Sequence, residues 1–91
     1  MVVLTELEKT VLLTFLVLAK KELKEFLPAE SVVNKFPIRQ RKHVRNAIKK
    51  LEKNKFLVRH PKKESYKLSE KGLKRALKLL HEGAKLWGYL K

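Results

Sequence analysis

The chain has 91 residues, of which 44% are hydrophobic and 35% charged, a mixture typical of one small globular domain rather than a disordered chain. Lys and Arg number 23 against nine acidic residues, so the formal net charge is +14 at pH 7 and a polyanionic partner is expected. Cysteine is absent, which excludes disulfides, thiolate metal sites and cysteine nucleophiles.

The longest apolar run covers residues 11–19 and predicts a buried helix within residues 1–26. Thr5 and Glu8 have the spacing of a capping box that opens this helix. The run is far shorter than the roughly 20 apolar residues that span a bilayer, and Glu6 and Glu8 stand where a signal peptide would carry positive charge. We therefore expect a cytoplasmic protein with no membrane partner. Because the helix is apolar all round, a second helix, a second subunit or both must cover it.

Two further helices are predicted on either side of Phe36-Pro37. Pro28 suits the first position of a short helix that runs to about Lys35. The residue before a proline is pushed out of the helical region, so a tight turn follows. A strong helix over residues 38–53 then completes a helix-turn-helix over residues 28–53. Its apolar face consists of Val44, Ala47, Ile48 and Leu51, and its opposite face is cationic.

A hairpin and a last helix complete the chain. Residues 56–60 and 65–68 are strand-like and predict a hairpin over residues 56–68, with its turn at residues 61–64. Ser69 is expected to cap a helix over residues 69–90. The expected buried stripe of that helix consists of Leu73, Ala76, Leu77, Leu80, Ala84 and Trp87.

The positive charge is concentrated in the middle third of the chain. Residues 35–63 hold 12 basic residues and one acid, Glu52, a net charge of +11. Residues 1–34 have a net charge of −1 and residues 64–91 a net charge of +4. A merely solvated Lys-rich surface would spread its charge more evenly, so this segment indicates a nucleic-acid-binding face.

The order of the predicted elements resembles that of a winged helix-turn-helix, a mainly α fold with a small β-hairpin wing, here in a single domain over residues 1–91. The similarity to MarR- and PadR-like regulators is carried by Leu4-Thr5-Glu6-Leu7-Glu8, Leu51-Glu52, Phe56-Leu57-Val58-Arg59 and Tyr66-Lys67-Leu68-Ser69-Glu70-Lys71-Gly72. The last of these is close to the family's Tyr-x-Leu-Thr-x-x-Gly. The Lys- and Glu-rich composition is also similar to that of hyperthermophile proteins.

The chain departs from the family pattern after the predicted recognition helix. Family members usually have Gly at this turn, whereas this chain has Lys55. We expect Asn54 to take the left-handed conformation in its place. The hydroxyl residue often found at the start of the recognition helix is also missing, and Phe36-Pro37 stand there.

A helix in the major groove reads base edges with its first turns, while flanking Lys and Arg meet phosphates. On that geometry the candidate base readers are Arg39, Lys42, His43 and Asn46, with Gln40 a weaker candidate because it lies toward the buried side. The candidate phosphate contacts are Lys49, Lys50 and Lys53 on the helix, and Arg59, Lys62 and Lys63 on the wing.

A homodimer is expected, because the first and last helices carry more apolar surface than one small core hides. The predicted seam consists of Leu12, Leu16, Leu80, Trp87 and Leu90.

We expect no enzyme activity, no metal and no cofactor. The histidines are His43, His60 and His81, and none lies three or four residues from another. The favoured function is a sequence-specific transcriptional regulator that binds double-stranded DNA at the nucleoid. The alternative is an RNA- or ribosome-associated, or sequence-blind chromatin-like, winged-helix protein. A small-molecule effector stays open.

Overall fold

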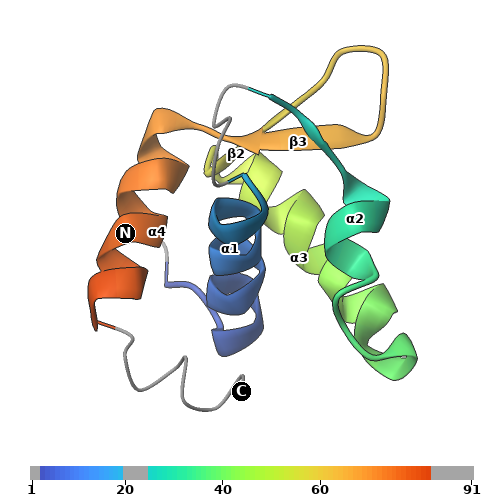
Figure 1. Ribbon diagram of the computed structural model, residues 1–91, viewed down its shortest axis with the longest axis horizontal. Coiled ribbons are helices and arrows are strands. Elements are labelled where there is room, and N and C mark those ends of the chain that lie inside the picture. Colours follow the sequence, from blue (N-terminus) through green and yellow to red (C-terminus); the bar gives the residue numbers. More distant parts are fainter. Residues whose placement is uncertain (1–2, 20–24, 83–91) are drawn as a thin grey trace.

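The computed structural model of the chain describes residues 3–19 and 25–82. In this part of the chain four α-helices and a short 3-10 helix pack with a three-stranded antiparallel sheet (Figure 1). In chain order the elements are α1 (Glu6–Leu18), β1 (Leu27–Pro28), α2 (Ala29–Val33), η1 (Ile38–Gln40), α3 (Arg41–Lys53), β2 (Leu57–Arg59), β3 (Ser65–Leu68) and α4 (Glu70–Glu82). This mainly helical arrangement is compatible with a winged-helix-like fold.

Helix α1 is the centre of the core. It lies between α4 on one side and α2 and α3 on the other, and it packs against all three (Figure 1). Val11 and Leu12 are 0% exposed and Phe15 is 1% exposed. Helices of the same chain therefore cover most of the apolar surface of α1 that was predicted to need cover. None of the described helices is long and apolar enough to cross a membrane.

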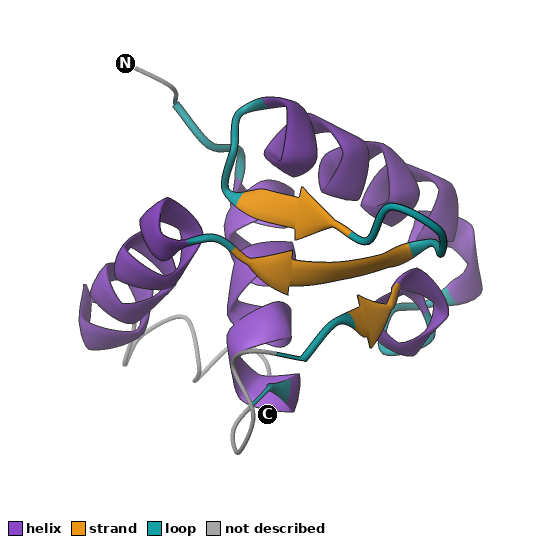
Figure 2. Cartoon of the chain, turned by 90° about the horizontal axis from the view of Figure 1, so that it is seen from above, coloured by secondary structure: helices purple, strands orange, loops and turns teal. Residues whose placement is uncertain are grey.

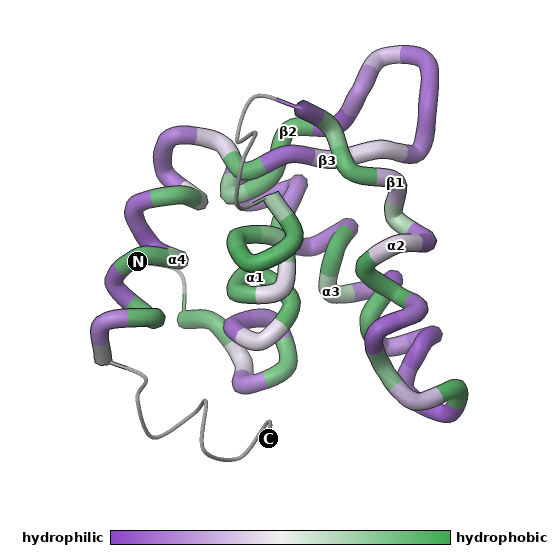
Figure 3. Tube along the Cα trace, in the orientation of Figure 1, coloured by the Kyte–Doolittle hydropathy of each residue, from purple (hydrophilic) through white to green (hydrophobic). Residues whose placement is uncertain are grey.

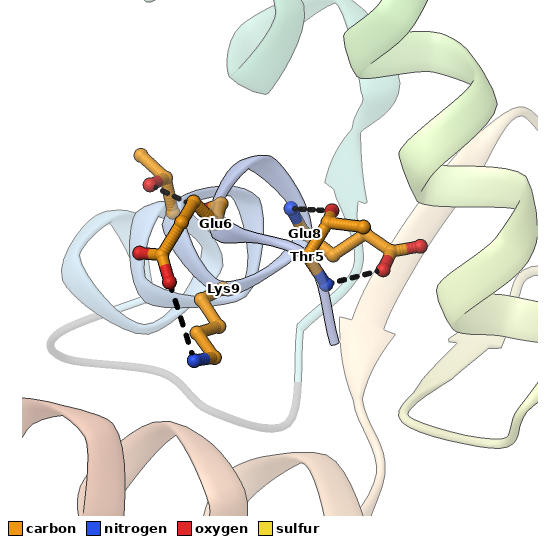
Figure 4. Close-up of polar contacts among 5 residues, drawn as sticks. Thr5, Glu6, Glu8 and Lys9 are labelled. Atoms are coloured by element: carbon orange, nitrogen blue, oxygen red, sulfur yellow. Dashed lines mark hydrogen bonds and ion pairs between the residues drawn. The ribbon is translucent and has the colours of Figure 1, made fainter. Parts of the chain in front are cut away.

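The predicted capping box is confirmed at the start of α1 (Figure 4). The Glu8 backbone N–H donates to the Thr5 hydroxyl at 3.1 Å, and the Thr5 N–H donates to the Glu8 carboxylate at 2.8 Å. Helix α1 occupies part of the predicted range 1–26. Helix α1 ends at Leu18, and Leu27 and Pro28 form strand β1.

The sheet has one strand more than the predicted hairpin (Figure 2). Its order is β1-β3-β2, with Leu27 opposite Tyr66 and Pro28 opposite Ser65. Pro28 is tolerated because β1 is an edge strand, where its missing N–H removes no ladder bond. Pro28 is also the N-cap residue of α2 rather than its first helical residue.

Helix α4 is capped as predicted, but it buries a different stripe. The Gly72 N–H donates to the Ser69 hydroxyl at 2.9 Å. Ala76 and Leu79 face the core at 0% and 4% exposure, whereas the predicted Leu77 is 49% exposed and the predicted Leu80 is 38% exposed. The buried stripe is rotated by about one residue from the prediction. Ala84 and Trp87 lie outside the described residues.

Gly72 is the last residue of the motif that resembles Tyr-x-Leu-Thr-x-x-Gly, and no side chain fits at this position. A Cβ atom at this position would lie 1.9 Å from the backbone carbonyl oxygen of Phe56. That oxygen accepts the Ser69 N–H at 3.1 Å, so the turn after α3 and the start of α4 are in direct backbone contact.

Replacing Gly72 by Ala should destabilise the fold by about 3 kcal/mol, the upper end of overpacking effects, because a backbone atom has to move. Urea unfolding followed by circular dichroism measures this loss. Lys74→Ala, at an exposed position of α4, is the control and should change the free energy of unfolding by less than about 0.5 kcal/mol. Equal stability of the two variants would contradict the close approach.

The turn after α3 places its left-handed residue one position later than predicted. Lys55 has a φ of 67°, whereas Asn54 has a φ of −87°. Lys55 thus adopts the left-handed conformation that glycine ordinarily provides. For a residue with a Cβ atom this conformation costs roughly 1–2 kcal/mol.

Lys55→Gly should therefore raise the free energy of unfolding by about 0.5–1 kcal/mol, since the relief of strain exceeds the entropy cost of a glycine. Asn54→Gly is the matched control and should lower it by a similar amount, because its φ is already negative. Thermal unfolding of both variants separates the two positions. The reverse order of stabilities would show that Asn54 carries the left-handed conformation.

Candidate nucleic-acid interface

Helix α3 separates an apolar face from a cationic face. Val44, Ala47, Ile48 and Leu51 are buried. All eight residues predicted to contact nucleic acid from this helical unit are exposed, namely Arg39, Gln40, Lys42, His43, Asn46, Lys49, Lys50 and Lys53. Figure 3 shows the same division, with green and purple alternating along α3. The burial of four aliphatic side chains thus fixes which side of α3 faces solvent.

The first turn of this unit is a 3-10 turn rather than α-helix. Pro37 starts it with a ψ of 148°, and the Gln40 N–H donates to the Pro37 carbonyl at 2.9 Å. The Arg41 N–H donates to the Ile38 carbonyl. Gln40, expected toward the buried side, is exposed because the tighter turn changes its direction.

Two arginines of α3 are held by the protein itself. The Arg41 Nε–H donates to the Phe36 carbonyl at 3.4 Å. The Arg45 guanidinium pairs with the Glu30 carboxylate of α2 at 2.8 Å. Arg45 therefore joins α3 to α2, and its charge is partly offset within the fold.

Within the described structure, no acidic side chain of the first turn lowers the positive potential at the start of α3. In the described part of the chain, no side chain caps this helix and no acidic residue stands in its first turn. The basic residues of its last turn, Lys50 and Lys53, suit the negative end of the dipole. The first turn therefore adds positive potential to the cationic face.

The β2–β3 hairpin carries the remaining three predicted contacts, Arg59, Lys62 and Lys63, and all three are exposed. Its turn is shaped by His60, whose Nδ1 accepts the Lys62 N–H at 3.0 Å. The Phe26 ring packs edge-on against the His60 ring, with 4.9 Å between the centroids. The His60 ring therefore contacts both the hairpin turn and the Phe26 ring.

The hairpin turn and α3 lie on the side of the molecule opposite α4 (Figures 1 and 2). A small cleft of about 110 Å³ joins them, with Lys49 of α3 on its wall together with Glu64 and Tyr66 of the hairpin. The structure thus brings the two predicted contact groups to one side of the fold.

Glu52, the one acid of residues 35–63, lies on the sheet side of α3. It is half-buried, and its carboxylate influences the pKa of the Tyr66 hydroxyl. Burial raises the pKa of the Tyr66 hydroxyl above its ordinary value of 10.0; the Glu52 carboxylate raises it further, Arg59 lowers it and Glu64 raises it. The exposed face of α3 is therefore free of acidic side chains in the described structure.

Part of the predicted dimer seam is wrong. Leu12 and Leu16 are 0% and 9% exposed inside one chain, because α3 and α4 pack around α1. Side chains that are already covered offer no surface to a second subunit. Leu80 is 38% exposed on α4, while Trp87 and Leu90 lie outside the described residues.

Sequence reasoning missed an exposed isoleucine and a groove beside the start of α3. Ile38 is 78% exposed in η1. A groove of about 620 Å³ runs between α1 and the turn that leads into η1, with Leu7, Leu13, Val17, Phe36 and Pro37 among its lining residues. Among residues 3–19 and 25–82, no three His, Asp or Glu side chains gather as metal ligands.

The sequence matches no known family model, and neither the curated proteins nor the solved structures yield a match.

Replacing Glu30 by Gln should strengthen binding to heparin, because it removes an acid and frees the Arg45 guanidinium. The matched control is Glu70→Gln, which removes an acid 3.6 Å from Lys74 on α4. E30Q should elute from a heparin column at higher salt than E70Q. Its stability should fall by less than about 1 kcal/mol, since the Glu30–Arg45 pair is exposed. Equal elution would show that Arg45 is outside the cationic face.

Proposed function

We propose that the chain is a winged helix-turn-helix protein that binds double-stranded DNA and regulates transcription. The single observation that carries the proposal is α3, which buries four aliphatic residues and exposes a continuous row of cationic and amide side chains. A helix of this kind fits the major groove of B-DNA. The β2–β3 hairpin takes the place of the wing.

Within this proposal the first turns of the helical unit read bases. The Arg39 guanidinium matches the O6 and N7 acceptors of guanine, and the Asn46 amide matches the N6 and N7 groups of adenine. Lys42 and His43 lie on the same exposed side. These residues give the preference for a sequence.

The remaining contacts are to phosphates, which fix position and supply most of the affinity. They involve Lys49, Lys50 and Lys53 on α3, and Arg59, Lys62 and Lys63 on the hairpin, all of them exposed. About six such contacts correspond to a slope near −5 for the logarithm of affinity against the logarithm of salt concentration.

The proposal includes a homodimer built on α4. Leu77 and Leu80 stay 49% and 38% exposed there, three residues apart and so on one side of the helix. A two-fold dimer presents two α3 helices to two half-sites and requires a palindromic DNA site.

The competing function is binding to the phosphates of RNA, or of any DNA, without regard to sequence; we call this a phosphate clamp. The observation that favours it is the predominance of Lys over Arg on the cationic face. A Lys ammonium is a compact point charge and lacks the forked N–H donors with which Arg pairs to base edges.

The deciding experiment is enrichment of binders from a random duplex DNA library at near-physiological salt, with structured RNA as competitor. We expect a palindromic motif. Recovery of no motif, with RNA as effective as DNA, would overturn sequence-specific regulation in favour of the phosphate clamp.

On the enriched site, Arg39→Ala combined with Asn46→Ala should weaken binding at least tenfold, because a good bidentate base contact is worth about 1–3 kcal/mol. Binding to random DNA should change little. Lys78→Ala is the control, since Lys78 is exposed on α4, a helix on the side of the molecule opposite α3 (Figure 1), and lies about 100° or more around that helix from Leu77 and Leu80. Fluorescence anisotropy measures both affinities, and a uniform loss on all DNA would contradict base reading.

A further inference from the structure

Ile38 is a large aliphatic residue whose side chain is exposed to solvent. It is 78% exposed, against 2% for Ile48, which lies on the buried face of α3. Single exposed apolar residues are common on protein surfaces. Ile38 differs in its place, because it opens the helical unit that carries the candidate base readers.

The backbone around Ile38 is held on both sides. Its carbonyl accepts the Arg41 N–H, and the Pro37 carbonyl accepts the Gln40 N–H at 2.9 Å. Phe36 packs against the core, and its carbonyl accepts the Arg41 side chain at 3.4 Å. The Ile38 side chain therefore projects from an ordered turn that is anchored in the core.

The surroundings of Ile38 are cationic. Arg39 is the next residue and Lys42 lies in the first turn of α3, and both are exposed. An anion that also offers an apolar group at the depth reached by a helix would complement this surface. The major groove of DNA meets both conditions, because each thymine displays a C5 methyl group among the polar base edges.

We infer that Ile38 is a specificity-determining residue that contacts the C5 methyl group of thymine. The inference rests on the proposed function and adds to it a preference for methyl-bearing base pairs next to the site read by Arg39. It also favours DNA over RNA, because uracil lacks the methyl group and the major groove of an RNA helix is too deep and narrow for side chains to read.

The test uses two pairs of duplexes that differ by this methyl group alone. In the first pair, an alternating dA-dT duplex is compared with an alternating dA-dU duplex. In the second pair, an alternating dG-dC duplex is compared with one that contains 5-methyl-dC, which places a methyl group at the equivalent ring position. Anisotropy titrations at one salt concentration give the affinity ratio within each pair.

For the wild-type chain we expect about fourfold tighter binding to the methylated member of each pair, the ratio that corresponds to burial of one methyl group. Ile38→Ala should reduce both ratios to about one while leaving the salt slope unchanged, because no charge is lost. Ile38→Val should keep part of the preference. Val58→Ala is the matched control, since Val58 is an aliphatic residue 40% exposed on β2, and this variant should keep the wild-type ratios.

The outcomes separate this inference from the function on which it rests. Binding to all four duplexes without a methyl preference would overturn the role of Ile38 and leave DNA binding intact. A preference that persists in Ile38→Ala would also overturn it, because the methyl group would then act through DNA shape. Binding to none of the duplexes would overturn DNA binding and the inference together. Circular dichroism checks that each variant is folded.

Discussion

The side chains of α1 point in all directions around the helix, and covering them determines how the other elements are placed. Val11, Leu12 and Phe15 are fully or almost fully buried, and α2, α3, α4 and β3 all pack against this helix. Each covering helix turns its apolar stripe inward to do so. The cationic residues of α3 then have one direction left, which is outward. The charged face is in this sense a consequence of the central apolar helix.

The predictions that the structure confirms at α1 and α3 rest on local signals, whereas pairings between distant segments were not predicted. The Thr5–Glu8 capping box and the two faces of α3 depend on spacings within one or two turns, and the structure confirms both. Strand β1 has only two residues, too few to show an alternation, and its partner lies almost 40 residues further along. The Glu30–Arg45 pair likewise depends on how α2 packs against α3.

The candidate site was largely predictable, because exposure follows from the helical period once the buried face is known. All eleven predicted contact residues are exposed. Ile38 was missed because an aliphatic residue at the start of a helix is ordinarily taken for core. Leu12 was assigned to a seam for the opposite reason, since sequence alone does not show how much apolar surface one chain covers. In α4 the sequence favours the stripe through Leu73, Leu77 and Leu80, yet packing against α1 buries Ala76 and Leu79.

The turn after α3 ties the end of that helix to the beginning of α4. The Ser69 hydroxyl donates to the Lys55 carbonyl at 2.6 Å, and the Lys71 ammonium donates to the Asn54 carbonyl at 3.1 Å. The same ammonium lies over the Phe56 ring, 4.5 Å from its centroid. A displacement of α4 therefore reaches the end of α3 directly, without first passing through the aliphatic core. The end of α3 and the beginning of α4 are thus joined by polar contacts within this short turn.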